Sequence, residues 1–410
     1  MQVKFRFFCH FLRIFPLFSG QREIFPVPPG IKTLLPLDKQ SFCAKFYQII
    51  VKYNCFYFTE APIMQQFKLN LIPGDGIGVD VINEGVRVLN ALAARHGAVK
   101  FEYNNLPWSC EYYLKHGAMM PADGMKILRD CDSILLGAVG FPGVPDHISL
   151  RDLLLPIRME FDQYVNMRPI KLLPGLTSPI KNDAIDFVVI RENTEGEYCG
   201  KGRMDNDMAL QEAIFTRKGT ERIIRYAFEY AKRKGKTRML SATKSNALNY
   251  SMVFWDNIYN EVKQEYPEFT STQMHIDALA GFFIMHPERM DVVVASNLFG
   301  DILTDLGSAM LGSIGISPSG NINPEGTFPS MFEPIHGSAP DIAGKGIANP
   351  LGTFWAIAMM LEQLKLNDCA GLLMDSMCAV LKAGAVRTPD IGGKSTTTDV
   401  TDAVIAEIMK

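Results

Sequence analysis

From about residue 64 onward, hydrophobic positions follow two alternating patterns. Short, apolar or β-branched runs predict strands at residues 67–72, 101–106, 133–139, 186–190, 238–242 and 291–295. Longer amphipathic stretches predict helices at residues 79–95, 220–234, 249–266 and 353–366. Because strands and helices alternate, we expect an α/β protein with a substantially parallel sheet. No low-complexity linker divides the chain, which favours interleaved over sequential domains.

Residues 1–63 do not share these patterns. They contain 11 of the 26 Phe residues, and Pro16 and Pro26 interrupt any amphipathic helix. We expect this N-terminal extension to be poorly ordered or absent from the mature protein, with Met64 as an alternative start. Its first 22 residues hold no acidic side chain, so a mitochondrial transit segment is the alternative to a cytoplasmic location.

Composition narrows the class of protein further. The formal net charge of −3 gives no basic surface for nucleic acid, so no nucleic-acid partner is expected. No apolar run reaches the ~20 residues of a membrane span. The eight cysteines have no paired CxxC spacing. Five of them look like reduced, mostly buried thiols of an intracellular protein: Cys110, Cys131, Cys199, Cys369 and Cys378.

Two aspartates carry the first chemical signal. Asp301 and Asp305 lie four residues apart at the start of a helix-like stretch that follows the predicted strand 291–295. This spacing puts both carboxylates on one helix face, where they repel by ~0.2–0.5 kcal/mol. A hard cation such as Mg²⁺ or Mn²⁺ would relieve the repulsion. Alone, the pair equally fits a carboxylate at a helix N-terminus beside a solvated one.

Three arginines form the second signal, and a glycine loop forms a weaker third. Arg158, Arg168 and Arg191 carry guanidinium groups, which suit carboxylate ligands, although any single arginine is more commonly a surface ion pair. The loop at residues 73–78 has three alternating glycines after a strand. Its third glycine comes one residue early for a dinucleotide-binding G-x-G-x-x-G motif, so we favour a supporting role.

Six motifs together carry a family resemblance. They are residues 72–78 (IPGDGIG), 167–169 (MRP), 191–196 (RENTEG), 243–246 (TKSN), 297–305 (NLFGDILTD) and 336–341 (HGSAPD). In this order they resemble the β-decarboxylating dehydrogenases, which include isocitrate and isopropylmalate dehydrogenases, from about residue 67 to residue 410. Residues 144–149, 161–166 and 192–198 are most similar to the tartrate/D-malate branch. Arg151 and Asp152 depart from that branch, which usually has Trp-Gly there, so this position leaves the substrate preference open.

The resemblance implies a fold and a domain division. The expected fold is the isopropylmalate dehydrogenase-like α/β fold, with two interleaved domains around a large mixed sheet, and not a Rossmann fold. Residues 64–163 and 312–410 would form a large cofactor-binding domain. Residues 164–311 would form a smaller domain for substrate binding and dimerisation.

The resemblance also implies a reaction, the oxidation of a (2R)-hydroxy dicarboxylic acid with decarboxylation. Arg158, Arg168 and Arg191 would bind the substrate carboxylates. Asp301 and Asp305 would bind Mg²⁺ or Mn²⁺ together with Asp277 of the partner subunit. Lys244, also from the partner subunit, would be the base, and Tyr198 the acid. The protein is therefore expected to be a homodimer with shared active sites.

For the cofactor, the resemblance implies NAD, with K⁺ as a further candidate ion. The expected contacts are His336, Gly337, Ser338, Ala339, Asp341 and Asn349. Asp341 can accept hydrogen bonds from the ribose hydroxyls of NAD and would repel the 2′-phosphate of NADP.

Three alternatives remain open at this stage. The substrate could be 3-isopropylmalate rather than D-malate or tartrate. An Mg²⁺-dependent phosphoryl- or prenyl-transfer enzyme would explain the aspartates and arginines but would leave Lys244 and the loop 336–341 without a role. A non-catalytic regulatory subunit of the same fold would require lost chemistry, yet every expected catalytic residue is present.

Overall fold

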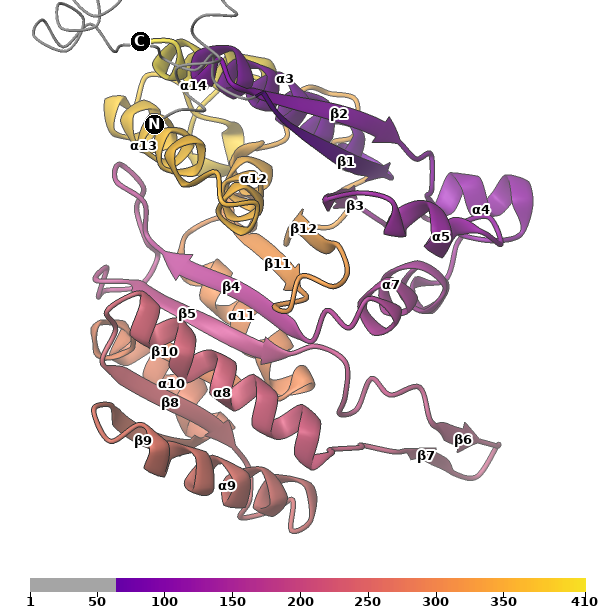
Figure 1. The fold of residues 1–410 in the computed structure, drawn as a ribbon, viewed down its shortest axis with the longest axis vertical. Helices are drawn as coiled ribbons and strands as arrows, with labels where there is room; N and C mark the ends of the chain where they lie inside the picture. Colours follow the sequence, from indigo (N-terminus) through magenta and orange to yellow (C-terminus); the bar gives the residue numbers. More distant parts are fainter. Residues whose placement is uncertain (1–63) are drawn as a thin grey trace, which may run out of the picture. The chain divides into compact units, whose positions relative to one another are not determined.

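A ten-stranded mixed sheet runs through the part of the chain that the computed structural model describes, residues 64–410 (Figure 1). Its strand order is β2-β1-β3-β12-β11-β4-β5-β10-β8-β9. The strands are β1 (Gln65–Gly74), β2 (Val99–Asn105), β3 (Ser133–Ala138), β4 (Val165–Lys171), β5 (Asp186–Glu192), β8 (Arg238–Thr243), β9 (Thr270–His275), β10 (Val292–Ala295), β11 (Pro318–Ile322) and β12 (Ser330–Pro334). The expectations for residues 1–63 lie outside the described residues.

Helices flank both faces of this sheet. They are α3 (Ile77–His96), α4 (Cys110–His116), α5 (Gly124–Arg129), α6 (Asp146–Ser149), α7 (Leu155–Glu160), α8 (Arg217–Arg233), α9 (Ser251–Val262), α10 (Ile276–Met285), α11 (Asn297–Met310), α12 (Leu351–Gln363), α13 (Asn367–Ala383) and α14 (Thr397–Ile408). A π-helical turn covers Leu150–Leu154, and 3₁₀ turns cover Lys263–Glu265, Pro287–Arg289, Ile314–Ile316 and Pro389–Ile391. None of the helices in residues 64–410 is long and apolar enough to cross a bilayer.

The sheet consists of two parallel blocks that meet at antiparallel strands. Strands β2, β1, β3 and β12 pair in parallel, as do β5, β10, β8 and β9. Strands β11 and β4 lie between the blocks and make antiparallel pairs with each other and with β12 and β5. The predicted α/β fold with a large mixed sheet is therefore confirmed.

Burial of the sheet on both faces explains its near-continuous apolar strands. All residues of β3 and all residues of β10 are buried. In Figure 1, α8 and α9 lie in front of β8 and β10, while α10 and α11 lie behind. Strands covered on both faces lack the polar alternation of a half-exposed strand, and this is the signal that the sequence carried for them.

Every strand and helix predicted from the sequence is present, with ends shifted by at most a few residues. The helix expected at residues 249–266 is the largest deviation, because α9 stops at Val262 and a 3₁₀ turn follows. The pattern did not reveal β4, β9, β11 and β12. Strand β11 reads PSGNI and β9 reads TSTQMH, so their polar and glycine residues hide strands that the surrounding sheet stabilises.

A two-stranded arm leaves the sheet between β5 and α8. It is formed by β6 (Gly202–Met204) and β7 (Ala209–Gln211), which pair antiparallel. Every residue of both strands is exposed. The arm therefore contributes no residue to the hydrophobic core of residues 64–410.

Candidate active site

Arg191 is the buried centre of a polar cluster at the end of β5. Its side chain is 2% exposed. The Nε and Nη2 atoms donate to Asn297 Oδ1 at 3.1 and 2.7 Å, and Nη1 donates to Asp301. Helix α11 can pack closely against Arg191 because residue 300 is a glycine. A Cβ atom on Gly300 would lie 2.6 Å from the Cβ and Cγ of Arg191. The motif glycine thus allows the helix that carries the aspartates to pack on the arginine.

Arg168, on the neighbouring strand β4, contacts both aspartates of α11. Its Nη2 lies 3.7 Å from Asp301 Oδ1, and its Nη1 lies 3.6 Å from Asp305 Oδ1. Nη1 also donates to Thr304 Oγ1 at 2.6 Å. The two carboxylates therefore share one helix face and one guanidinium group.

Arg158 lies on the short helix α7. A π-helical turn precedes α7, and such turns are frequent at functional sites. Arg158 Nη2 donates to Glu333 Oε1 on β12 at 3.1 Å, and both side chains are about 90% buried. Losing one partner of such a buried pair typically costs about 3–5 kcal/mol.

The three arginines and the carboxylates of Asp301, Asp305 and Glu333 balance in formal charge. The arginines are more deeply buried than the two aspartates. Burial lowers the pKa of Arg168 and lowers that of Arg191 to about 10, and the neighbouring guanidinium groups, including Arg158, act in the same direction. Burial alone would raise the pKa of Asp301, but the charges of Arg191 and Arg168 lower it overall. Burial raises the pKa of Asp305. Buried guanidinium groups beside carboxylates that are partly exposed suit an anionic ligand and a cation.

Tyr198 reaches the same cluster from the turn after β5. Its hydroxyl donates to Asp301 Oδ2 at 2.9 Å, and the Arg191 guanidinium lies 5.7 Å from its ring centroid. Burial, followed by the Asp301 charge, raises the pKa of Tyr198 to about 12. The tyrosine therefore holds its proton at neutral pH.

Lys244 and Asp277 form a separate pair. Lys244 follows β8, Asp277 lies in the first turn of α10, and Lys244 Nζ donates to Asp277 Oδ1 at 2.6 Å. This hydrogen bond lowers the pKa of Asp277, whose side chain is 68% exposed. Within residues 64–410, no three His, Cys, Asp or Glu side chains lie together as a metal site. One chain thus brings together Asp301 and Asp305 but leaves Asp277 with Lys244.

The predicted cofactor residues occupy the segment between β12 and α12. Ile77 N donates to Ser338 O at 2.8 Å, and a Cβ atom on Gly76 would lie 2.0 Å from that oxygen. The glycine loop therefore supports the segment 336–341 by direct backbone contact. His336 is buried, which lowers its pKa, and its Nε2 atom has no hydrogen-bond partner in the described part of the chain.

The remaining residues of this segment differ in their surroundings. Gly337 and Asp341 are exposed, whereas Ser338 is buried. Ala339 has a φ of 40°, a left-handed conformation that is uncommon for a non-glycine residue. Asn349 is already engaged, because its Nδ2 donates to Asp390 and its Oδ1 accepts from Leu351 N.

Comparison with known proteins identifies the family of this chain. The family model described as isocitrate/isopropylmalate dehydrogenase matches residues 68–404. The chain belongs to the isocitrate/isopropylmalate dehydrogenase family. A crystal structure of isocitrate dehydrogenase from Methylococcus capsulatus is similar, with a TM-score of 0.77, 32% sequence identity, and coverage of 84% of this chain and 100% of that one.

Three similar relatives carry tartrate dehydrogenase or D-malate dehydrogenase names. A "Probable tartrate dehydrogenase/decarboxylase" of Bacillus subtilis (strain 168) is 51% identical, covering 85% of this chain and 99% of the relative. The "D-malate dehydrogenase [decarboxylating]" of Escherichia coli (strain K12) is 50% identical, covering 85% and 100%. The "Tartrate dehydrogenase/decarboxylase" of Pseudomonas putida is 49% identical, covering 82% and 96%. The predicted decarboxylating dehydrogenase of the tartrate/D-malate type is confirmed.

Sequence reasoning missed several polar residues that hold this dehydrogenase site together. Asn297 lies in a motif that was recognised, yet only the aspartates of that motif received a role. Glu333 and Thr304 carried no sequence signal, because their importance comes from their contacts with Arg158 and Arg168. An unusual density of polar residues in otherwise buried strands was the available hint.

Proposed function

We propose that this dehydrogenase oxidises and decarboxylates a (2R)-hydroxy dicarboxylic acid, D-malate or a tartrate, with NAD and a divalent metal ion. The observation that carries the proposal is the convergence of Arg158, Arg168 and Arg191 on the carboxylates of α11 and β12. The names of the relatives at 49–51% identity support the small-substrate branch. The assay is formation of NADH, followed at 340 nm, with each candidate diacid.

The arginines suit a substrate with two carboxylates. The Nε atoms of Arg158 and Arg168 are buried and have no hydrogen-bond partner among residues 64–410. A buried donor without an acceptor costs about 1–3 kcal/mol. A substrate carboxylate at this site would supply acceptors, and a bidentate guanidinium–carboxylate pair also fixes orientation. Ordinary metabolic monoacids would leave one part of this site unused.

Asp301 and Asp305 fit a hard divalent cation. Both are oxygen donors on one helix face, and each keeps lone pairs that the arginine contacts do not use. We propose that Asp277 of the partner subunit completes the set. A bound Mg²⁺ or Mn²⁺ would polarise the C2 oxygen and stabilise the charge that decarboxylation leaves. K⁺ remains a candidate for an additional activating ion.

Two residues would move protons. We assign Lys244 of the partner subunit as the base for the C2 hydroxyl proton. Tyr198 would return a proton to the carbon from which the carboxylate departs. Its raised pKa keeps the hydroxyl protonated at neutral pH, and that hydroxyl donates to Asp301 Oδ2 at 2.9 Å.

The segment 336–341 would bind NAD. His336 Nε2 is buried and lacks a partner in the described part of the protein, so it could bond a cofactor group. Asp341 is exposed, and no hydrogen bond or ion pair engages its carboxylate among residues 64–410. It is therefore free to accept from the two ribose hydroxyls, and its charge would disfavour a 2′-phosphate.

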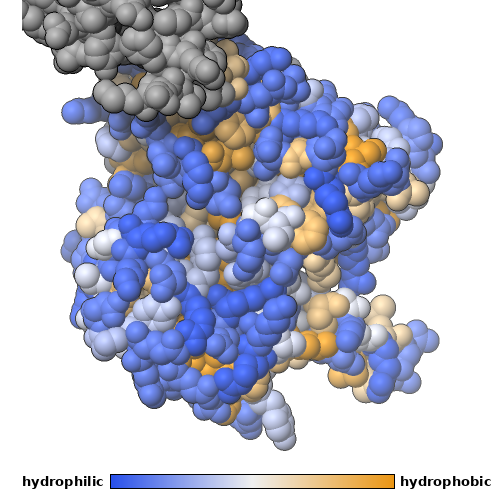
Figure 2. Space-filling model, in the orientation of Figure 1, coloured by the Kyte–Doolittle hydropathy of each residue, from blue (hydrophilic) through white to orange (hydrophobic). Residues whose placement is uncertain are grey.

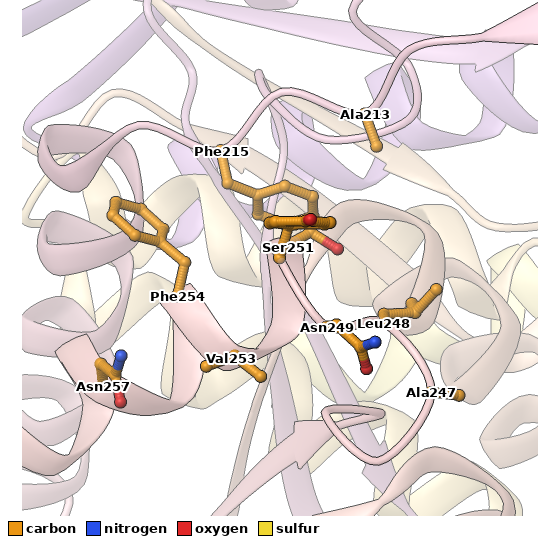
Figure 3. Close-up of a pocket in the computed structure, with 10 residues that line it drawn as sticks. Ala213, Phe215, Ala247, Leu248, Asn249, Ser251, Val253, Phe254 and Asn257 are labelled. Carbon is orange, nitrogen blue, oxygen red and sulfur yellow. The ribbon is translucent and has the colours of Figure 1, made fainter.

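The shared site requires a homodimer, and the exposed apolar surface supports one. On the arm, Met204 is 84% exposed and Leu210 is 43% exposed; Figure 2 shows hydrophobic residues on this projection. A hollow of about 810 Å³ lies between α9 and the segment that follows β7, and residues shortly after Lys244 in the sequence also line it (Figure 3). Phe215 and Phe254 line it, and Tyr250 beside them is 92% exposed. A second copy would cover these side chains.

A further inference from the structure

A chain of buried amide and carboxylate side chains lies behind the arginines. It consists of Asn166 on β4, Asn193 after β5, Asn321 on β11 and Glu333 on β12. Asn166 and Asn321 are fully buried, and Asn193 and Glu333 nearly so. Buried polar groups are costly unless they are hydrogen-bonded, so this chain across the sheet centre calls for an explanation.

Its hydrogen bonds fix the orientation of Asn321. Asn321 Nδ2 donates to Glu333 Oε1 at 2.8 Å. Asn321 Oδ1 accepts from the Nδ2 atoms of Asn166 and Asn193, each at 3.0 Å. A carboxylate on one side and two amide donors on the other match the two ends of an amide group. Turning Asn321 over would break all three bonds.

Glu333 connects Asn321 to Arg158 in the candidate active site. The same Oε1 atom that accepts from Asn321 also accepts from Arg158 Nη2 at 3.1 Å. The charged groups that face Glu333 from the described elements are Arg158 on α7 and Arg168 on β4. A Glu333 side chain that lost Asn321 could adopt other rotamers, and Arg158 would move with it.

We propose that Asn321 is a positioning residue for substrate binding, which holds Glu333 in the orientation that presents Arg158 to a substrate carboxylate. The inference rests on the proposed function, in which Arg158 binds the diacid. Asn321 itself does not touch the reacting atoms. Its loss should therefore weaken binding of the substrate more than it slows the chemical step, which raises KM while kcat changes little.

The first test is the near-isosteric Asn321→Asp variant. It replaces the donor to Glu333 with a carboxylate oxygen, so two acids face each other within hydrogen-bond distance. Two facing acids take up a proton more readily than either acid alone, because each ionised carboxylate repels the other. Assays at about pH 6 and about pH 8.5 compare conditions in which a proton is more and less available to the pair, and the acids repel once the proton has left. KM for the diacid should then rise about tenfold between these pH values, relative to wild type, with kcat within about threefold.

Asn70→Asp is the matched control. Asn70 is also fully buried in this sheet, on β1, but it donates to the carbonyl oxygens of Ile127 and Leu128 and has no link to Glu333. This variant introduces the same buried charge elsewhere. Its KM should follow wild type at both pH values, even though its melting temperature falls. A pH-dependent KM in this control would show that the KM change in Asn321→Asp comes from general destabilisation, and would overturn the proposal.

Two further variants complete the test. Combining Asn321→Asp with Glu333→Gln exchanges the amide and the acid, so only one of the two facing side chains is an acid and no proton is shared between two carboxylates. This double variant should lose the pH dependence of KM. The neutral Asn321→Ser variant should raise KM about tenfold at both pH values, which gives a result even if Asn321→Asp does not fold.

The outcomes separate this proposal from the function on which it rests. Wild-type enzyme that forms no NADH with any diacid refutes the proposed function, and the positioning role with it. Active wild-type enzyme with an unchanged KM in Asn321→Asp or Asn321→Ser refutes the positioning role alone. Persistence of the pH effect in the double variant would also refute it.

Discussion

Mixing two inactive variants tests whether each active site is built from two chains. Lys244 and Asp277 bond to each other, and in residues 64–410 no hydrogen bond or ion pair joins them to Asp301 or Arg191. If both members of this pair act in the neighbouring subunit, Lys244→Ala and Asp301→Ala damage different halves of one site. Each variant alone should be inactive, and a mixture of the two should recover activity.

The expected recovery follows from counting sites. Random exchange of equal amounts yields about half hybrid dimers. In each hybrid, the Lys244→Ala chain keeps its own Asp301 and receives an intact Lys244, so one of its two sites is complete. The mixture should therefore regain about one quarter of the wild-type sites. A site contained within one chain would regain none, because every chain carries a defect.

The assay is NADH formation after subunit exchange under mild denaturant, with exchange verified by differently tagged chains. The matched control mixes Lys244→Ala with Asp277→Ala. Both residues belong to the same donated pair, so every site in that hybrid lacks one of them and no activity should return. Recovery in the control, or none in the main mixture after verified exchange, would refute the shared site.

Three further outcomes follow from the structure. Asp305→Asn should lower kcat/KM about a hundredfold and raise the Mn²⁺ requirement, and full activity in excess chelator would contradict a metal role. Asp341→Lys with Ile342→Tyr should raise the NADP/NAD preference at least about tenfold, because each exposed charge pair at 4 Å is worth about 1 kcal/mol; an unchanged preference would place ribose recognition elsewhere. Asp291→Asn should lower the free energy of unfolding by about 2 kcal/mol at pH 7, because Arg238 and two backbone amides outweigh burial and lower the pKa of Asp291 to about 2. That contribution is present above the unfolded pKa near 4 and is lost as pH falls toward 2, so melts of both proteins should converge on acidification.

Much of the fold was predictable because its strands are buried on both faces. Strand β10 has the sequence VVVA, and such an uninterrupted apolar run predicts a strand that is buried on both faces. Strand β11 could not be found in this way. Its Asn321 is buried only because Asn166, Asn193 and Glu333 satisfy it, and these partners are far away in sequence.

The candidate site likewise has local features that the sequence predicts and non-local contacts that it does not. The four-residue spacing of Asp301 and Asp305 is local, so the sequence alone placed both on one helix face. The contact between Arg168 and Asp301 is not local in sequence. It depends on the antiparallel pairing that brings β4 beside β5 at the sheet centre. The motif resemblance implied roles for all three residues in one active site, but it gave no contact between Arg168 and the aspartates. It gave no role to Glu333, because a residue that acts through another residue leaves no local pattern.

A substrate panel under one set of conditions tests the proposed dehydrogenase activity most directly. Initial rates of NADH formation would be measured with NAD⁺, Mn²⁺ and K⁺ for D-malate, the tartrate isomers, isocitrate and 3-isopropylmalate. D-malate or a tartrate should give the highest kcat/KM. A tenfold lead for isocitrate or 3-isopropylmalate, about 1.4 kcal/mol in transition-state binding, would contradict it.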